Sequence, residues 1–419
     1  MGAMPIGPIG AMPPGATMPI GAGMGVPPYG ADPYAACGNG LPSDMGVGYY
    51  DPPSSFGTER IWVSAHYLLG YLSRPGLATP LVVTGSTADV HPGAIDSPNT
   101  RILYGEDQYQ FNPLNGVRLD VGVNLNDRLY LEGSILYFGP QHSSALFVSD
   151  PAGNPFIARP FFNATLGQER AFLTASPGIA AGSTNVQTRL QLFSIEGHAR
   201  YQVNVTPYLS VDYLLGYRRM QLEEELEVTD TLLPIGGSIT FLGQSVTAPN
   251  TVSDFDRFAT FNQFDGINTG MRFRWQSGFH WFAMTGHGKL AVGQTRQTVE
   301  IEGVSGATTA AGPQSAAGGI LALPSNMGTH KRTVFGIIPE GGASLVFLVA
   351  PGVRLHAGYT ATYWNNVVRP GDQIDRRLNT AQVPTDLNFA PGAGGFPVFE
   401  FRDRAVWLQT LNFGVELYY

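Results

Sequence analysis

The chain has 419 residues and a formal net charge of −8, and only 13% of its residues are charged, about half the share usual in soluble globular domains. Its 53 glycines and 32 prolines exclude a coiled coil or a helical bundle, because both residue types weaken helices. The acidic balance argues against a nucleic-acid partner, and 43% hydrophobic residues exclude a wholly disordered chain. An all-β protein, or a protein embedded in lipid, remains.

Residues 1–57 differ in composition from the rest of the chain. They hold 13 glycines and 11 prolines but no Lys or Arg, and Met-Pro-Ile-Gly occurs at 4–7 and again at 18–21. Such a segment buries too little apolar surface to offset its ordering entropy. We therefore predict a disordered N-terminal tail over 1–57, which is either an unstructured leader or a spacer that tethers a periplasmic partner.

The single cysteine, Cys37, excludes an internal disulfide and a cysteine-based zinc site. No window holds the 18 or so consecutive apolar residues of a transmembrane helix. No apolar stretch of the kind found in secretion signals precedes Arg60, the first basic residue. We therefore expect the sequence to begin at a mature or trimmed end.

From residue 58 onward, apolar residues recur at alternate positions, which is the pattern of a strand with one apolar face. The first run places Ile61, Val63 and Ala65 on one face, and Phe413, Val415 and Leu417 do the same near the end of the chain. The pattern predicts ten strands, at about 61–71, 117–125, 129–137, 193–201, 209–217, 267–275, 282–292, 335–347, 353–363 and 407–419.

The connections between these segments alternate strictly in length. Four are short, around 126–127, 204–207, 276–278 and 350–352, and five are long, at about 73–113, 139–185, 229–253, 302–328 and 365–402. Outer-membrane barrels have this asymmetry, whereas Greek-key sandwiches do not sort their loops in this way. We predict an all-β fold over 58–419. It is an up-and-down antiparallel transmembrane β-barrel of about ten strands in the bacterial outer membrane, with both termini periplasmic.

Two details support a barrel. If Val349 pairs with Val353 across the last short turn, then Phe347 faces Leu355, Val346 faces His356 and Ser344 faces Gly358, so that both apolar sets stay on one face. Aromatic residues also gather near the strand ends, where we expect them to form the girdles at the lipid headgroups. These residues are Trp62, Tyr71, Tyr130, Phe138, Trp275, Trp281, Tyr363, Trp364, Trp407, Tyr418 and Tyr419.

Four longer blocks carry a resemblance to a known family. They are Glu-Arg-Ile-Trp-Val-Ser-Ala at 59–65, Ala-Arg-Pro-Phe-Phe-Asn at 158–163, Gly-Ile-Leu-Ala-Leu-Pro-Ser-Asn at 319–326, and the run from Tyr363 to Arg376. Over about 59–419 the chain resembles the bacterial beta-barrel porin-7 family of outer-membrane proteins. The resemblance implies an outer-membrane barrel and no particular substrate.

The face opposite the apolar set is predicted to line the lumen. Its charged and histidine residues are Arg118, Asp120, Glu132, Glu196, His198, Arg200, Asp212, Arg218, Arg272, Arg274, His287, Lys289, Glu340, Arg354, His356 and Glu416. Seven Arg and Lys stand against six Asp and Glu, whereas selective pores usually carry an excess of one sign. A ten-stranded barrel is also narrow. We therefore expect a salt-bridged core, with a small porin for passive diffusion of ions or small solutes as the alternative.

Other functions have weaker support. His198, His287 and His356 could serve a barrel-embedded hydrolase, but no Gly-x-Ser-x-Gly or His-Glu-x-x-His run occurs, so we expect no enzyme. Asp372 and Asp375 supply at most half of a calcium site, and we expect turns with local ion pairs over 369–377 and neither a metal nor a cofactor.

The predicted function is a structural or surface-loop interaction scaffold, with outer-membrane lipid around it and a possible surface partner on its long loops.

Overall fold

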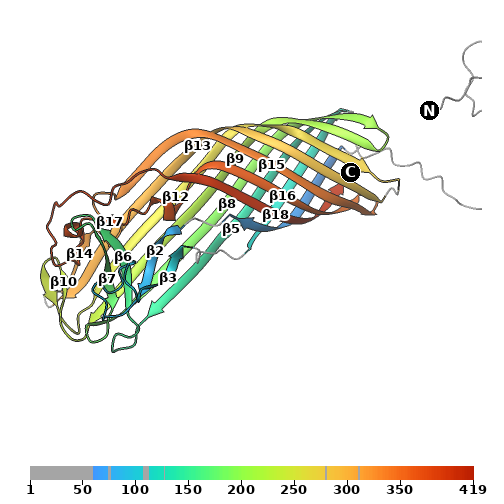
Figure 1. The fold of residues 1–419 in the computed structure, drawn as a ribbon. Helices are drawn as coiled ribbons and strands as arrows, with labels where there is room; N and C mark the ends of the chain where they lie inside the picture. The colour runs from blue at the N-terminus through green and yellow to red at the C-terminus, as the bar shows by residue number, and fades with distance from the viewer. Residues whose placement is uncertain (1–59, 74–76, 107–112, 127, 279–280, 310–311) are drawn as a thin grey trace, which may run out of the picture. The chain divides into compact units, whose positions relative to one another are not determined.

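The computed structural model describes residues 60–73, 77–106, 113–126, 128–278, 281–309 and 312–419. The predicted tail at 1–57 lies outside these ranges. Ten long strands dominate the described chain (Figure 1). They are β1 (Ile61–Leu72), β4 (Leu114–Asn126), β5 (Leu129–Val148), β8 (Ala180–Thr206), β9 (Leu209–Pro234), β12 (Val252–Gln276), β13 (Phe282–Thr309), β15 (Gly328–Ala350), β16 (Val353–Val368) and β18 (Asp403–Tyr418).

These ten strands form one closed antiparallel ring. Each strand pairs with the next along the chain, and β1 pairs with β18 from Trp62 opposite Tyr418 to Leu72 opposite Leu408. The barrel predicted from the alternating pattern is therefore confirmed. Among the described residues no helix has the length and apolar character needed to cross a bilayer.

The predicted register across the turn between β15 and β16 is also correct. Phe347 pairs with Leu355 and Val346 with His356. At the turn itself, however, Ala350 pairs with Val353, and a bulge takes up the residue between Leu348 and Ala350. Because the bulge absorbs one residue, the rest of the ladder keeps the expected faces.

Several barrel strands are longer than predicted, so the connections expected at 139–185, 229–253 and 302–328 are wrong in extent. A transmembrane strand needs about 9–11 residues, but β9 has 26 and β13 has 28. The outward face of β9 changes from apolar residues such as Leu215 to polar ones such as Glu223 and Glu225, while Leu222 points inward and is buried. The alternation inverts where lipid gives way to water, so the apolar pattern ends before the strand does.

The outer connections are folded rather than irregular. A small sheet contains β2 (Leu77–Thr84), β3 (Arg101–Glu106), β6 (Ile157–Asn163), β7 (Gln168–Ala175) and β17 (Arg377–Leu378), and β6 pairs in parallel with β17. We name this sheet, the loops between β2 and β3 and between β6 and β7, and residues 369–402 the cap; it includes the short helices η1 (Pro370–Gln373) and η2 (Thr380–Gln382). A hairpin of β10 (Ile239–Phe241) and β11 (Gln244–Val246), and β14 (Gly312–Ala317) beside β13, complete the outer end. Figure 1 shows the cap gathered at the end opposite the C-terminus.

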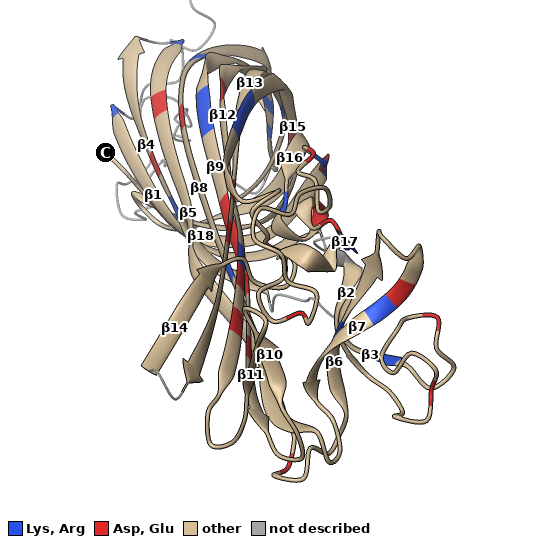
Figure 2. Ribbon diagram, turned by 90° about the vertical axis from the view of Figure 1, so that its left-hand side faces the viewer, with Lys and Arg blue, Asp and Glu red and all other residues tan. Residues whose placement is uncertain are grey.

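The lipid-facing surface is an apolar band of half-exposed side chains such as Leu119 (52%), Leu215 (61%) and Phe413 (51%). Figure 2 shows largely uncharged ribbons in the barrel, with separate charged segments and one longer run of red and blue on the strands toward β10 and β11. The expected aromatic girdles are only partly correct. Tyr130, Phe138 and Trp364 are at most 2% exposed, because they point into the barrel instead of toward lipid.

Candidate functional site

The interior of the barrel contains three successive layers. A polar layer lies toward the short turns, an apolar layer crosses the middle, and the cap fills the outer end. The inward faces of the same ten strands supply the first two layers, because period 2 keeps each strand's inward positions on one face. The arrangement places charge, apolar packing and loop structure in sequence along one axis.

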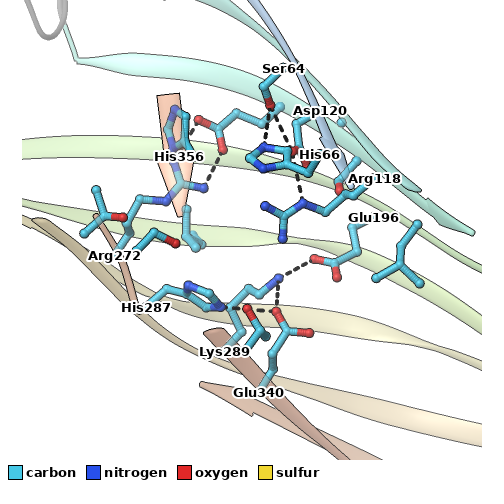
Figure 3. A pocket seen from close by; sticks show the side chains of 18 of the residues that line it. Ser64, His66, Arg118, Asp120, Glu196, Arg272, His287, Lys289, Glu340 and His356 are labelled. Atoms are coloured by element: carbon cyan, nitrogen blue, oxygen red, sulfur yellow. Dashed lines mark hydrogen bonds and ion pairs between the residues drawn. The ribbon is translucent and has the colours of Figure 1, made fainter. Parts of the chain in front are cut away.

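The polar layer surrounds a cavity of about 170 Å³ (Figure 3). Fourteen of the sixteen residues predicted for the lumen line it. The other two, His198 and Asp212, do not line the cavity but pair with residues that do: His198 Nε2 is 2.9 Å from Glu132 Oε2, and Arg200 Nη1 is 3.0 Å from Asp212 Oδ2. The structure thus brings the whole predicted set together.

The first charge cluster centres on Glu132 of β5. Arg200 Nε lies 2.6 Å from its Oε1 atom, and Arg272 donates from Nη2 to Oε2 at 3.0 Å. Arg272 belongs to β12, so this pair crosses the lumen. Glu132 is 7% exposed and Arg200 4%, and buried charges of this kind are tolerated only when they are paired.

The second cluster also crosses the lumen. Lys289 of β13 lies 2.8 Å from Glu196 of β8 and 2.6 Å from Glu340 of β15. Arg218 of β9 donates from Nη1 to Glu340 Oε2 at 2.8 Å, and His287 Nε2 is 3.4 Å from Glu340 Oε1. Because Glu340 pairs with side chains of both β9 and β13, the cluster resists flattening of the barrel.

The third cluster joins β1 to β4. Asp120 Oδ2 accepts from Arg118 Nε and from Ser64 Oγ, each at 3.1 Å, and lies 3.3 Å from His66 Nε2. Our sequence analysis missed Ser64 and His66. The signal was present, because both occupy the inward positions that alternate with Val63, Ala65 and Tyr67.

The fourth cluster joins β16 to β18. Arg354 Nη1 donates to Glu416 Oε1 at 2.5 Å, and His356 Nε2 lies 3.3 Å from Glu416 Oε2. The Arg354 guanidinium also lies 3.9 Å from the centre of the Tyr418 ring, a cation–π contact. Arg274 of β12 lines the same cavity.

Above the polar layer, apolar side chains from all ten barrel strands meet in the lumen. We name this layer the septum. It consists of Leu68, Leu114, Phe138, Leu190, Leu192, Met220, Leu222, Phe264, Ala291, Ile338, Trp364, Val367, Val406 and Leu408. Their exposed fractions do not exceed 3%. The rings of Phe264 and Trp364 meet edge to face at 6.5 Å, and Trp364 Nε1 donates to Thr295 Oγ1 at 3.1 Å. The septum therefore fills the lumen with packed side chains.

The outer end of β16 extends past the septum toward the cap. Asn366 has φ +50, a left-handed conformation that asparagine tolerates better than most residues. Beyond it, Asn262 of β12 donates from Nδ2 to Val368 O at 2.8 Å and accepts from Val368 N at 2.9 Å. This reciprocal pair satisfies a buried stretch of backbone and directs the chain into the cap.

Arg369 ties this segment to the far wall. Its guanidinium makes a bidentate pair with Glu224 of β9 and donates from Nη1 to Ser73 O at 2.9 Å. Arg369 is 1% exposed and Glu224 2%. The prediction of local ion pairs over 369–377 is wrong for Arg369, whose partner lies 145 positions away, and for Asp372, which pairs with Arg404.

The local prediction is correct for Asp375, whose Oδ1 accepts from Arg377 Nε at 2.9 Å. Among the described residues, no group of three or more His, Cys, Asp or Glu is arranged to hold a metal ion.

A second buried arginine holds the small sheet of the cap against the barrel wall. Arg159 of β6 donates to Asp230 of β9 at 2.8 Å and to Asp256 of β12 at 3.0 Å. Asp256 Oδ1 also accepts from three consecutive backbone N–H groups, at residues 320–322. Two of the four family-like blocks, at 158–163 and 319–326, thus meet at Asp256. The block at 363–376 joins them, because Phe162 N donates to Arg376 O at 2.8 Å and all three blocks supply residues to one buried apolar cluster.

Asp254 lies beside this arginine and is 2% exposed. Burial raises its pKa to about 7, and the charges of Asp230 and Asp256 act in the same direction. Ser305 donates to Asp254 Oδ1 at 2.6 Å. Sequence reasoning missed Asp230, Asp254 and Asp256, because the inverted alternation that turns them inward was not recognised.

A family model described as "Putative beta barrel porin-7" matches residues 62–419. The chain belongs to this family. The predicted membership is thereby confirmed, and this porin-family protein is an antiparallel β-barrel of the bacterial outer membrane. A comparison with curated proteins found no match.

Solved structures that resemble this porin-family chain include three outer-membrane proteins. The outer membrane protease OmpT of Escherichia coli has 8% identity and a TM-score of 0.37, with 86% of this chain and 94% of that chain covered. Ail, the attachment invasion locus protein of Yersinia pestis, has 9% identity and a TM-score of 0.22, with 86% and 99% covered. A FadL homologue of Pseudomonas aeruginosa has 8% identity and a TM-score of 0.25, with 86% and 90% covered.

Proposed function

We propose that this porin-family protein is a closed barrel that works as a structural scaffold and presents the cap at the cell surface. The observation that carries this proposal is the septum, to which all ten strands contribute buried apolar side chains. A pore needs a continuous polar path, and close-packed apolar side chains leave no room for water. The charge clusters below the septum serve to lock the strands together.

The cap is the part of the scaffold that meets other molecules. It is ordered by buried ion pairs and presents exposed apolar tips at Val90 (89% exposed), Leu166 (59%) and Leu387 (77%). Loops held by a rigid scaffold are common binding elements. We propose that the cap binds a surface partner, and that the tail at 1–57 tethers a periplasmic one.

We also propose that the lumen is not an active site. Ser64, His66 and Asp120 are the residue types of a hydrolytic triad, and Ser64 Oγ lies 3.0 Å from His66 Nε2. In a working triad the carboxylate holds the opposite ring nitrogen, but Asp120 Oδ2 approaches the same Nε2 atom at 3.3 Å. A search for cleavage of labelled peptides by the intact protein tests this; specific cleavage would contradict it.

Passive diffusion is the competing function, since the cavity of about 170 Å³ forms a polar route through part of the barrel. That route meets Met220 and Leu408 of the septum, which also line the cavity. A liposome-swelling assay separates the two functions. Liposomes that hold the purified protein should swell in a small neutral sugar no faster than protein-free liposomes. Swelling that depends on the protein dose and falls with sugar size would favour the porin function.

A further inference from the structure

Basic side chains gather on the outward face of the barrel where the lipid-facing band ends on the cap side. Arg219 of β9 lies directly opposite Asp265 of β12. Arg296 of β13 lies opposite Gln263, which is two positions further out along β12. The side chains of Arg219 and Arg296 are 42% and 56% exposed. These two arginines therefore belong to the outer wall and not to the paired charges of the lumen.

The strand register places this pair of arginines at the margin of the lipid-facing band. Toward the short turns, the next outward positions are Tyr217, Ile267 and Val292, which are exposed and form one row across β9, β12 and β13. Toward the cap, the outward positions become polar, and Gln221 donates to Gln263 at 3.0 Å. An arginine at such a margin covers apolar surface with its stem and keeps its charged end at the level of the lipid headgroups.

Asp265 is shared by both guanidinium groups and cannot neutralise them both. Arg219 Nε lies 2.7 Å from its Oδ1 atom, and Arg296 Nη2 lies 3.8 Å from its Oδ2 atom. Gln263 also donates to Oδ2 at 2.7 Å, and Tyr217 donates to Oδ1. Each guanidinium has five N–H donors, more than this carboxylate can accept. The group therefore keeps one surplus positive charge and spare donors on the lipid side of the wall.

A third base extends this group, and an acidic row limits it on the cap side. Lys331 of β15 is exposed and lies opposite Thr298, the next outward position after Arg296 on β13. Further out the face is acidic, and Arg257 is shared there by three carboxylates, those of Glu225, Glu300 and Glu302. An anion is therefore attracted to the belt formed by the three bases and is repelled by the negative surplus of the row beyond it.

We propose that the belt of Arg219, Arg296 and Lys331 binds the phosphate of a lipid headgroup in the outer leaflet. Guanidinium groups suit phosphate oxygens, because they can donate two parallel hydrogen bonds. The acyl chains of the same lipid pack on the apolar positions beside the belt, where Ile267 and Phe335 are each 63% exposed. A phosphorylated lipid thus matches both surfaces, whereas a free phosphate matches the charge alone. The proposal takes from the scaffold function only that the cap faces the cell surface.

Native mass spectrometry of the full-length protein in non-ionic detergent tests the proposal, with dioleoyl phosphatidic acid and dioleoyl phosphatidylcholine as probes. The two lipids have the same acyl chains, but only phosphatidic acid presents a phosphate without an attached cation. We expect the parent protein to bind phosphatidic acid about tenfold more tightly, because each base near an anionic headgroup adds to the attraction. The double variant Arg219→Gln with Arg296→Gln should lose this preference.

Arg402→Gln is the matched control, since the Arg402 side chain is 44% exposed in the cap, and it should keep the preference. Heat-dependent gel migration reports whether each variant is folded, and Arg296→Gln alone replaces the double variant if that one fails to fold. Equal binding of both lipids by the parent, an unchanged preference in the folded variant, or an equal loss in Arg402→Gln would each overturn the proposal. Displacement of phosphatidic acid by millimolar inorganic phosphate would also overturn it, in favour of free phosphate. The septum is tested separately by sugar permeation.

Discussion

Single buried charges join parts of this chain that are far apart in sequence. Arg369 reaches Glu224 across 145 positions and Arg159 reaches Asp256 across 97. Each guanidinium is 1% exposed, so it depends on its carboxylate for charge compensation. Breaking a buried pair on one side costs more than the intact pair contributes, because the partner remains as an uncompensated charge.

Glu224→Gln should loosen the cap. The substitution leaves the guanidinium of Arg369 without its carboxylate, which costs roughly 3–5 kcal/mol. Hydrogen exchange should then speed up in residues 369–383 and in β6. Glu225→Gln is the matched control, because Glu225 points outward on the same strand and its side chain is 20% exposed. Equal protection in both variants would show that the pair does not hold the cap.

Acidic pH should stabilise the cap through Asp254. Its pKa is about 7 in the folded protein and near 3.8 in an ordinary setting, so the folded state binds more protons between these values. The free energy of unfolding therefore falls by at most roughly 4 kcal/mol as the pH rises from about 4 to 7. Above pH 7 it does not change further through this group. Asp254→Asn should remove this slope in hydrogen exchange followed between pH 5 and 8. A slope that persists in the variant would assign it to another group.

Among the elements, alternation predicted the ten strands, their order and the register between β15 and β16 beyond the turn, because period 2 is a local property of sequence. It did not predict the ends of β8, β9, β12 and β13. There the outward face turns polar and the inward face apolar, as at Glu223 and Leu222, and a search for one apolar face stops at the change.

The cap could not be predicted from sequence. Its parallel pairing of β17 with β6 joins residues 377–378 to 162–163, and the preference for that partner lies in buried contacts rather than in local pattern. Of the luminal site, the sixteen predicted residues could be found from their inward positions. Their division into four clusters could not, because it depends on which strands face each other across the ring.

Glycines at inward positions of the polar layer leave room for neighbouring side chains. Gly414→Ala should destabilise the barrel by about 1–3 kcal/mol, because the new Cβ would lie 2.1 Å from His66 Nδ1. Gly288→Ala is the control, since nothing lies within 4 Å of a Cβ added there. Unfolding in urea, followed by tryptophan fluorescence in detergent micelles, should separate the two. Equal midpoints would mean that the His66 ring can move aside at little cost.

In the whole barrel, the described strands form a closed ring whose lumen is blocked by the septum. Charge clusters surround the cavity near the short turns, the septum fills the middle, and the cap covers the outer end. The outward faces of the membrane-spanning strands are broadly apolar. The low share of charged residues therefore reflects the lipid-facing band together with the septum, and the charges of the polar layer are paired inside the barrel.

The septum closes the lumen, and current recordings across planar lipid bilayers measure whether ions pass it. The purified protein should give no stable conductance steps. The variant Phe264→Ala with Trp364→Ala, which removes two septum rings, should give small steps, and Phe273→Ala, a lipid-facing change on the same strand, should give none. Stable nanosiemens steps from the unaltered protein, as expected of an open porin, would show that the septum does not close the lumen.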